Sequence, residues 1–284
     1  MKKVLVTGKK GSLSVAVSEY LDQKEYCSTE RISLRDDRFL SASFSDVDTV
    51  VHIAGVTPKN SRSIMDFYAV NTDLTRRLAE KCREEGVRQF IYISSMAVYG
   101  VTQSMDDEKG TVTANTPLSP ASDYGKSKLQ AEQTLNELAD ERFSVAIIRV
   151  PSIYGKGKTE YLDQYRYLAQ KTSSIPVAFA DHYKSAICVE NLCELIALII
   201  KNDAKGVFCP DDGCYAAVDY CCAIFPEKKR SRLLGRMMEI FLKQNERILD
   251  YYGTVCYARE LTDIFDGAYR IKSFQEAVSA AYEP

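Results

Sequence analysis

The chain has 284 residues, 45% of them hydrophobic and 27% charged, which is enough to bury the core of one large domain and a smaller one without metals or disulfides. No apolar stretch approaches the length of a membrane span, so we expect a soluble protein with no integral membrane segment. Thirty-seven basic and 39 acidic residues give a net charge of -2. This balance provides no basic field and disfavours nucleic acid as a partner.

The nine cysteines and two histidines show no paired Cys-x-x-Cys spacing, so we predict no metal site. The N-terminal MKKVLVTG has too short an apolar run for a signal peptide. Together with the odd number of cysteines, it predicts a cytoplasmic protein with free thiols.

The first 150 residues alternate between apolar runs and segments with helical spacing. Strands are expected at residues 3–6, 31–34, 48–54, 89–95 and 145–150. Helices are expected at residues 12–22, 64–86, with Gly86 as a left-handed cap, and 123–141. Apolar strands that alternate with helices predict an α/β fold, a Rossmann-like doubly wound parallel sheet with ligands at the carboxyl ends of its strands.

Residues 1–150 are therefore predicted to form a dinucleotide-binding Rossmann domain that carries the catalytic residues. Residues 151–284 are predicted to form a smaller substrate-binding region that partly returns to the main sheet, with strands at 175–179 and 206–209.

A basic segment at 228–241 has two interpretations. Lys228, Lys229, Arg230 and Arg232 precede apolar residues at helical spacing. Such a segment can lie on an anionic membrane, but we favour a core-facing helix with a solvated start.

The segment TGKKGSLS places Gly8 and Gly11 between the first strand and the first helix, as in dinucleotide-binding turns. Glycines let the backbone approach a pyrophosphate, and the amides of Ser12 and Leu13 open the helix that faces it. Ser14 stands where a third glycine is common, and we expect it to loosen this turn modestly.

The end of the second strand normally selects the cofactor. Arg35 suits a 2′-phosphate, whereas the carboxylate of Asp36 suits a free ribose. The sequence offers both and leaves NAD and NADP open.

Tyr124 and Lys128 lie four residues apart at the start of a predicted helix, so their side chains share one face. Because a tyrosine has a pKa near 10, it needs a nearby cation to act as a base, and Lys128 is predicted to supply it. Ser95, at the end of a strand, can donate and accept hydrogen bonds beside a reacting oxygen. His52 is predicted to be structural.

Six motifs occur in a characteristic order. They are TGKKG, HIAG at 52–55, VNTDL at 70–74, SSMAVYG at 94–100, YGKSK at 124–128 and RVPSIYG at 149–155. With them the chain resembles the extended short-chain dehydrogenase/reductase family, in particular its NAD-dependent epimerase/dehydratase members and the nucleotide-sugar epimerase or 4-ketoreductase branch.

This resemblance implies roles for further residues. Ser95, Tyr124 and Lys128 would be the catalytic triad, Lys128 would also hold the nicotinamide ribose, and Asn71 would support the site. Further cofactor contacts would be Ile53, Ala54, Gly55, Val150 and Pro151. Substrate contacts would be Ser95, Met96, Ser152 and Lys184.

The resemblance also implies a nucleotide-diphosphate sugar as substrate and NAD or NADP as cofactor. Ser152 replaces the family's nucleotide-contacting Asn, and Lys184 replaces a phosphate-binding Arg, so uridine specificity stays open. A homodimer through the helices at 64–86 and 123–141 is implied as well.

Family members that eliminate water carry an acid where this chain has Met96 and Ala97, which disfavours elimination. Epimerisation by hydride transfer at the sugar 4-position, in the synthesis of cell-surface polysaccharide sugars, is the first hypothesis. The alternatives are a nucleotide-4-keto-sugar reductase, a reductase of a non-sugar carbonyl, and a non-catalytic dinucleotide-sensing protein.

Overall fold

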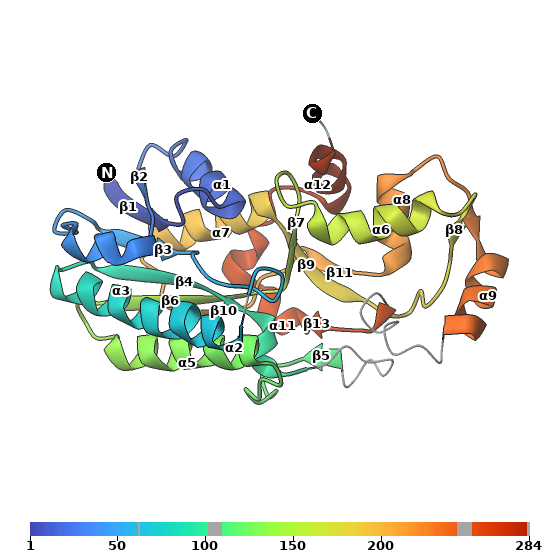
Figure 1. The fold of residues 1–284 in the computed structure, drawn as a ribbon. Helices are drawn as coiled ribbons and strands as arrows, with labels where there is room; N and C mark the ends of the chain where they lie inside the picture. The colour runs from blue at the N-terminus through green and yellow to red at the C-terminus, as the bar shows by residue number, and fades with distance from the viewer. Residues whose placement is uncertain (62, 102–109, 243–251, 283–284) are drawn as a thin grey trace.

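The computed structural model describes residues 1–61, 63–101, 110–242 and 252–282, and leaves out the side chains of Asp36 and Leu242. A sheet of six parallel strands runs through its N-terminal part (Figure 1). The strand order is β10-β6-β4-β3-β1-β2. The bounds are β1 Lys2–Thr7, β2 Cys27–Ile32, β3 Thr49–His52, β4 Gln89–Ser95, β6 Ser144–Val150 and β10 Gly206–Phe208.

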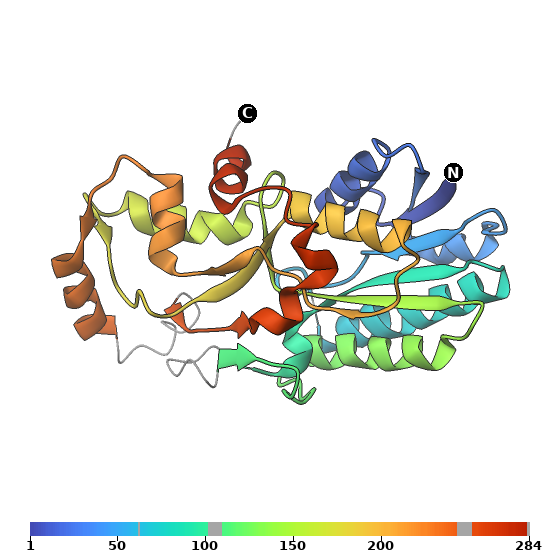
Figure 2. The same ribbon diagram turned by 180° about the vertical axis from the view of Figure 1, so that it is seen from behind.

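Helices cover both faces of this sheet, as Figures 1 and 2 show from opposite sides. Helices α1 (Ser12–Leu21) and α7 (Val189–Lys201) pack on one face, and α3 (Leu74–Glu84) and α5 (Asp123–Leu138) on the other. The prediction of a Rossmann-like doubly wound α/β fold is confirmed. Strand order reverses beside β1, so the carboxyl ends of β1 and β3 border the crevice where such folds bind ligands.

Two strands differ from their predicted bounds. The second strand lies at Cys27–Ile32 and not at 31–34, because its pairing with β1 sets the strand, whereas the polar edge sequence CSTERI gives no apolar signal. The third strand ends at His52 and not at residue 54, since the amides of Ile53 and Ala54 turn away to bond Thr7.

The predicted helix at 64–86 is present but interrupted. It comprises α2 (Ile64–Asp66), a π-helical segment η2 (Phe67–Asp73) and α3. Single π turns inside helices often mark functional positions, and Asn71 lies within this one. Gly86, with φ +83°, ends the helix in the left-handed region as predicted.

The C-terminal part is assembled from shorter elements. A second sheet has the order β11-β9-β7, formed by β7 Ser152–Tyr154, β9 Lys184–Cys188 and β11 Gly213–Tyr215. It packs against an aromatic-rich cluster with α6 Glu160–Gln170, α8 Ala217–Ile224 and α12 Phe274–Ala281. Strand β10 and helix α7 lie after residue 150 but belong to the main sheet and its covering layer.

The remaining elements are small. They are η1 Arg35–Ser41, η3 Met96–Tyr99, β5 Thr111–Val112, β8 Ile175–Pro176, β12 Arg230–Ser231, α9 Arg232–Leu242, β13 Cys256–Tyr257, α11 Arg259–Thr262 and η4 Ile264–Gly267. The strand predicted at 175–179 stops at Pro176 and is followed by Phe179, whose φ of +50° is incompatible with a strand. Within the described residues, no helix has the length and apolar character needed to cross a bilayer.

Candidate active site

The glycine turn joins β1 to α1 at the edge where a dinucleotide is expected. Gly8 has φ +101°, a conformation that side chains rarely adopt, and its amide donates to the carbonyl of Ile32 on β2. Gly11 is the N-cap of α1, and no side chain caps this end of the helix. The amides that open α1, at Ser12 and Leu13, therefore suit a phosphate.

Ser14 holds this turn together. It is fully buried, and its hydroxyl lies within bonding distance of two carbonyls, that of Gly8 and, at 2.8 Å, that of Gly11. The loosening expected from the missing third glycine is therefore not found. The Ser14 side chain points to carbonyl groups of the glycine turn itself and stabilises the turn. The turn remains compatible with a dinucleotide.

A buried hydrogen-bond network orders the loop after β3. The Thr7 hydroxyl accepts from the amides of Ile53 and Ala54, both at 3.0 Å, so its proton points to Nδ1 of His52 at 2.9 Å. The other ring nitrogen then donates to Thr75 at 2.9 Å. Burial, and then the charge of Lys128, lower the pKa of His52 to about 3, which confirms a neutral, structural histidine.

The predicted cofactor-selecting residues follow β2. Arg35 begins η1, three residues beyond Ile32, and its side chain is exposed. The side chain of Asp36 lies outside the described residues. Because Ile32 is paired with Thr7 next to the glycine turn, Arg35 stands on the side of the turn where an adenosine ribose is expected.

Tyr124, near the start of α5, lies close to Ser95 at the end of β4. Ser95 ends β4 and its Oγ accepts from the amide of Ala97 at 3.2 Å, which leaves the serine proton for the phenol oxygen of Tyr124. Burial raises the pKa of Tyr124, and the hydrogen bond from Ser95 opposes that rise. Phe67 packs edge-on against the tyrosine ring, at 5.9 Å between centroids.

Lys128 is buried at the same edge of the sheet. Its Nζ donates to the carbonyl of Ile93 at 2.8 Å and lies 4.6 Å from the ring centroid of Tyr92. Burial lowers its pKa to about 8, against the attraction of Glu132. The predicted lowering of the Tyr124 pKa by Lys128 is not found, because this ammonium group faces the β4 backbone and the phenol is desolvated.

Asn71 connects the cofactor loop to the catalytic helix. Its amide accepts from the Val56 amide at 2.8 Å, donates to the Val56 carbonyl at 3.0 Å and reaches the Ser127 hydroxyl on α5 at 3.2 Å. A side chain at Gly55 would lie 3.0 Å from Asn71 and 3.6 Å from Lys128. The absence of a side chain at position 55 therefore lets the loop after β3 lie close to Asn71 and Lys128.

A buried ion pair beneath the triad was not predicted. Glu132 lies one helical turn beyond Lys128, and its carboxylate receives the Arg149 guanidinium at 2.7 Å and the hydroxyl of Ser94. Arg149 also donates to the Tyr99 phenol at 2.8 Å. The recurrence of polar residues at 124, 128 and 132, all on one helical face, was the available signal.

The predicted substrate residues lie on the C-terminal side of the triad. Val150 is paired with Ser95 and leads through Pro151 into β7. Ser152 is paired with Ala186, two residues from Lys184 on the same face of β9. Lys184 is buried, and Met96 is buried in an apolar cluster with Val98 and Tyr99. Tyr161, which lies close to Ser152, was not predicted.

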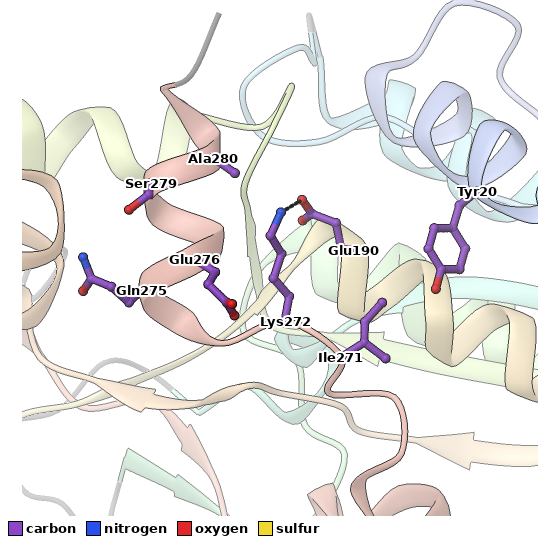
Figure 3. Close-up of a pocket in the computed structure, with 8 residues that line it drawn as sticks. All are labelled: Tyr20, Glu190, Ile271, Lys272, Gln275, Glu276, Ser279 and Ala280. Carbon is purple, nitrogen blue, oxygen red and sulfur yellow. Dashed lines mark hydrogen bonds and ion pairs between the residues drawn. The ribbon is translucent and has the colours of Figure 1, made fainter.

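A cavity of about 670 Å³ lies away from this site, between α12 and the start of α7 (Figure 3). Lys272 and Glu190 face each other across it in an ion pair of 2.6 Å. The residues that line it are Tyr20, Glu190, Ile271, Lys272, Gln275, Glu276, Ser279 and Ala280. None of them belongs to the triad or to the glycine turn, so the chemistry lies elsewhere. Within the described part of the chain, no cluster of three or more potential ligand side chains could hold a metal ion.

The site combines three features: a helix without a side-chain cap after a glycine turn, a buried lysine, and a tyrosine next to a serine. Together they are typical of dinucleotide-binding α/β proteins with a Ser-Tyr-Lys centre. Residues 4–204 match the NAD dependent epimerase/dehydratase family, and the chain belongs to this family. The predicted family is thereby confirmed.

Two curated relatives illustrate the similarity. An N-acetyl-α-D-glucosaminyl-diphospho-ditrans,octacis-undecaprenol 4-epimerase of Escherichia coli is 33% identical over 178 residues, 61% of this chain and 51% of the relative. A UDP-glucose 4-epimerase of Vibrio cholerae is 28% identical over 241 residues, 75% and 71% of the two chains. The chain spans about half the length of the first curated relatives that it matches.

Solved structures share the fold at lower identity. The Bordetella bronchiseptica enzyme WbmH, in complex with NAD+, has a TM-score of 0.71 at 17% identity, over 99% of this chain and 97% of that one. A dTDP-4-dehydrorhamnose reductase of Clostridium acetobutylicum has a TM-score of 0.69 at 17% identity, over 98% of both chains.

Proposed function

We propose that this protein is a nucleotide-sugar epimerase that acts at the sugar 4-position with NAD or NADP. The observation that carries the proposal is the placement of the Ser95 hydroxyl next to the Tyr124 phenol at the carboxyl edge of the sheet, with the buried ammonium group of Lys128 one turn farther along α5. The phenolate form of such a tyrosine can take and return the proton of a sugar hydroxyl.

The glycine turn, Arg35, the 53–55 loop and Lys128 would hold the cofactor, with Val150 and Pro151 beside them. The fit is supported by the uncapped amides of α1 and by Gly55, where a side chain would make a tight contact with the Asn71 side chain. A bound nicotinamide supplies reversible hydride transfer at the sugar carbon.

The protein's own residues handle the proton. Tyr124, in its phenolate form, would take the proton of the 4-hydroxyl as that oxygen becomes a carbonyl, and would return it when the opposite face of the carbon is reduced. The Ser95 hydroxyl would turn from the phenol to donate a hydrogen bond to that oxygen. Since Met96 is buried among apolar side chains and Ala97 carries no acid, the residues after Ser95 provide no proton donor to expel a neighbouring hydroxyl.

Substrate recognition is assigned to residues 151–284 as a second part of the proposal. Ser152 and Lys184 project from one face of the small sheet, and Tyr161 lies close to Ser152. Among the relatives, the Vibrio cholerae protein is named for UDP-glucose and the Escherichia coli protein for a lipid-linked diphospho-sugar. A sugar diphosphate is the shared chemistry, and a nucleotide-diphosphate sugar is our first candidate.

The experiment is conversion of a panel of UDP- and dTDP-sugars by the purified protein, followed by NMR. An epimerase interconverts 4-epimers without net consumption of cofactor and, in D2O, without deuterium at C4, because the hydrogen removed is the one returned. Stoichiometric oxidation of NADPH with a 4-keto sugar would indicate the reductase instead. If no sugar diphosphate is converted or bound, the proposal fails and a non-sugar reductase or a dinucleotide sensor takes its place.

Cell location and assembly belong to the same proposal. A cytoplasmic homodimer built on α3 and α5, without nucleic acid, in the supply of sugars for surface polysaccharide, is consistent with the net charge of -2. Size-exclusion chromatography with light scattering tests the dimer directly.

A further inference from the structure

Helix α9 packs with an unexpected orientation. Helix α9 lies closest to the rest of the protein at Gly235, where a Cβ would be 2.0 Å from the carbonyl oxygen of Val177. The carboxylate of Glu239 accepts from the amide of Phe179 at 2.7 Å. Gly235 and Glu239 are one turn apart, so they define the face of α9 that rests on the protein.

Four of the large apolar residues of α9 lie on the opposite, outward side, while Met238 packs against the apolar cluster of the C-terminal part. Helical spacing of four, three and one residues places four large side chains on one stripe. Their exposed fractions are Leu233 74%, Met237 49%, Ile240 73% and Phe241 77%. We call these four residues the α9 stripe. The core-facing helix favoured by the sequence is found only in part: Met238 packs against the apolar cluster of the C-terminal part, on the side of Glu239, whereas the α9 stripe points outward.

Basic residues accompany the stripe. The segment 228–241 holds five basic residues and one acidic residue, Glu239, whereas the whole chain has a net charge of -2. Lys229, Arg230, Arg232 and Arg236 are exposed, and the last two lie along one edge of the stripe by their helical spacing. Glu239 is turned inward and is bonded to Phe179.

The position of α9 leaves the stripe accessible. Figures 1 and 2 place the helix at the extreme end of the molecule, farthest from the six-stranded sheet. An exposed apolar stripe edged by arginines matches a bilayer interface, where apolar side chains enter the acyl boundary and basic groups meet anionic headgroups.

We propose that α9 docks this protein on an anionic membrane surface, with the α9 stripe buried at the interface and Arg232 and Arg236 on lipid phosphates. The contact is peripheral: α9 lies along the surface without crossing it. The inference is independent of the proposed function, since it uses no residue of the triad or of the glycine turn.

The test is co-sedimentation of the full chain with vesicles of phosphatidylcholine, with and without phosphatidylglycerol. We expect binding to the anionic vesicles and at least tenfold weaker binding to the neutral ones. Ile240→Ser with Phe241→Ser removes two stripe residues and should weaken binding more than tenfold. The matched control, Ile64→Ser with Met65→Ser, removes two exposed apolar residues of α2 and should leave binding unchanged.

A second variant tests the charge. Arg232→Gln with Arg236→Gln should lower binding about 30-fold at low salt, since each basic residue near an anionic surface contributes about fivefold. It should also abolish the preference for phosphatidylglycerol. Circular dichroism of each variant reports whether it folds.

Two results would overturn the proposal. One is that the folded wild-type chain fails to bind anionic vesicles, or that the folded Ile240→Ser, Phe241→Ser variant binds them as well as the wild type does. The other is a stripe variant that turns a dimer into a monomer while vesicle binding persists, which would make the stripe an interface between copies of this chain.

Discussion

The region around the six-stranded sheet and the distal end of the C-terminal region place their apolar and polar side chains in opposite ways. Around the sheet, helices such as α7 bury their apolar faces, and buried polar side chains such as His52, between Thr7 and Thr75, are hydrogen-bonded on both sides. At the distal end, α9 turns the half-buried carboxylate of Glu239 toward the protein and exposes isoleucine and phenylalanine. The sheet region holds its apolar side chains inside and carries the proposed catalytic residues, whereas the outer face of α9 presents apolar side chains to a proposed membrane contact.

The largest expected effect tests whether the chemistry lies at the sheet. Tyr124→Phe should lower turnover by about 10²–10⁴-fold, because the phenol is the proton carrier. Cofactor affinity should change little, since the glycine turn is untouched. Steady-state kinetics and a fluorescence titration with reduced cofactor measure the two quantities.

The matched control for this variant is Tyr68→Phe. The Tyr68 phenol donates to Asp123 at 3.1 Å, at the start of the same helix, but has no assigned role in proton transfer. Its turnover should stay within about twofold of wild type. Unchanged turnover in Tyr124→Phe would remove the mechanism.

The buried ion pair tests how strictly the sheet region demands polar partners. Arg149→Met leaves the carboxylate of Glu132 buried without its cation, and should cost about 3–5 kcal/mol of unfolding free energy. The double variant with Glu132→Gln should recover much of this loss, because the uncompensated charge is gone. Urea denaturation measures both. A single-variant loss below about 1 kcal/mol would mean that solvent reaches the pair.

Acid should weaken the same region through His52. Its pKa is lowered from 6.5 to about 3 in the folded protein, so between these values the unfolded chain binds a proton that the folded one does not. Stability is full above about pH 6.5 and falls on acidification by about 1.4 kcal/mol per pH unit. His52→Gln should lack this part of the slope. Parallel slopes in the two proteins would show that His52 titrates normally.

Ser14→Ala tests the tie in the glycine turn. Loss of the two carbonyl contacts should cost about 1–2 kcal/mol of stability and weaken cofactor binding severalfold. Ser18→Ala is the control: it removes a hydroxyl contact with Thr29, one turn farther along α1. Calorimetric titration should show lower cofactor affinity for the first variant only, and equal affinities would separate the turn from the cofactor.

The smallest effect contrasts the two regions directly. Ile240→Ala on α9 should change the unfolding free energy by less than about 0.5 kcal/mol, as exposed positions do. Ile196→Ala on α7, where the side chain is fully buried, should cost about 2–5 kcal/mol. A comparable loss at Ile240 would show that the stripe is covered in solution and would weaken the membrane proposal.

Several features followed from the sequence because they depend on neighbouring residues. The strand at 89–95 coincides with its predicted bounds, since a continuous apolar run of this length specifies a buried strand. Tyr124 and Lys128 share a helical face because four residues make about one turn. The order of the motifs specified the family, and with it the topology of the sheet.

Only the tertiary structure decided the contacts between distant segments. The bounds of β2 depend on its pairing with β1, the tie at Ser14 depends on the path of the loop, and the Glu132–Arg149 pair joins a helix to a strand. For α9 the sequence established an apolar face but not its direction. Periodicity describes one helix, whereas burial depends on what the rest of the chain places against it.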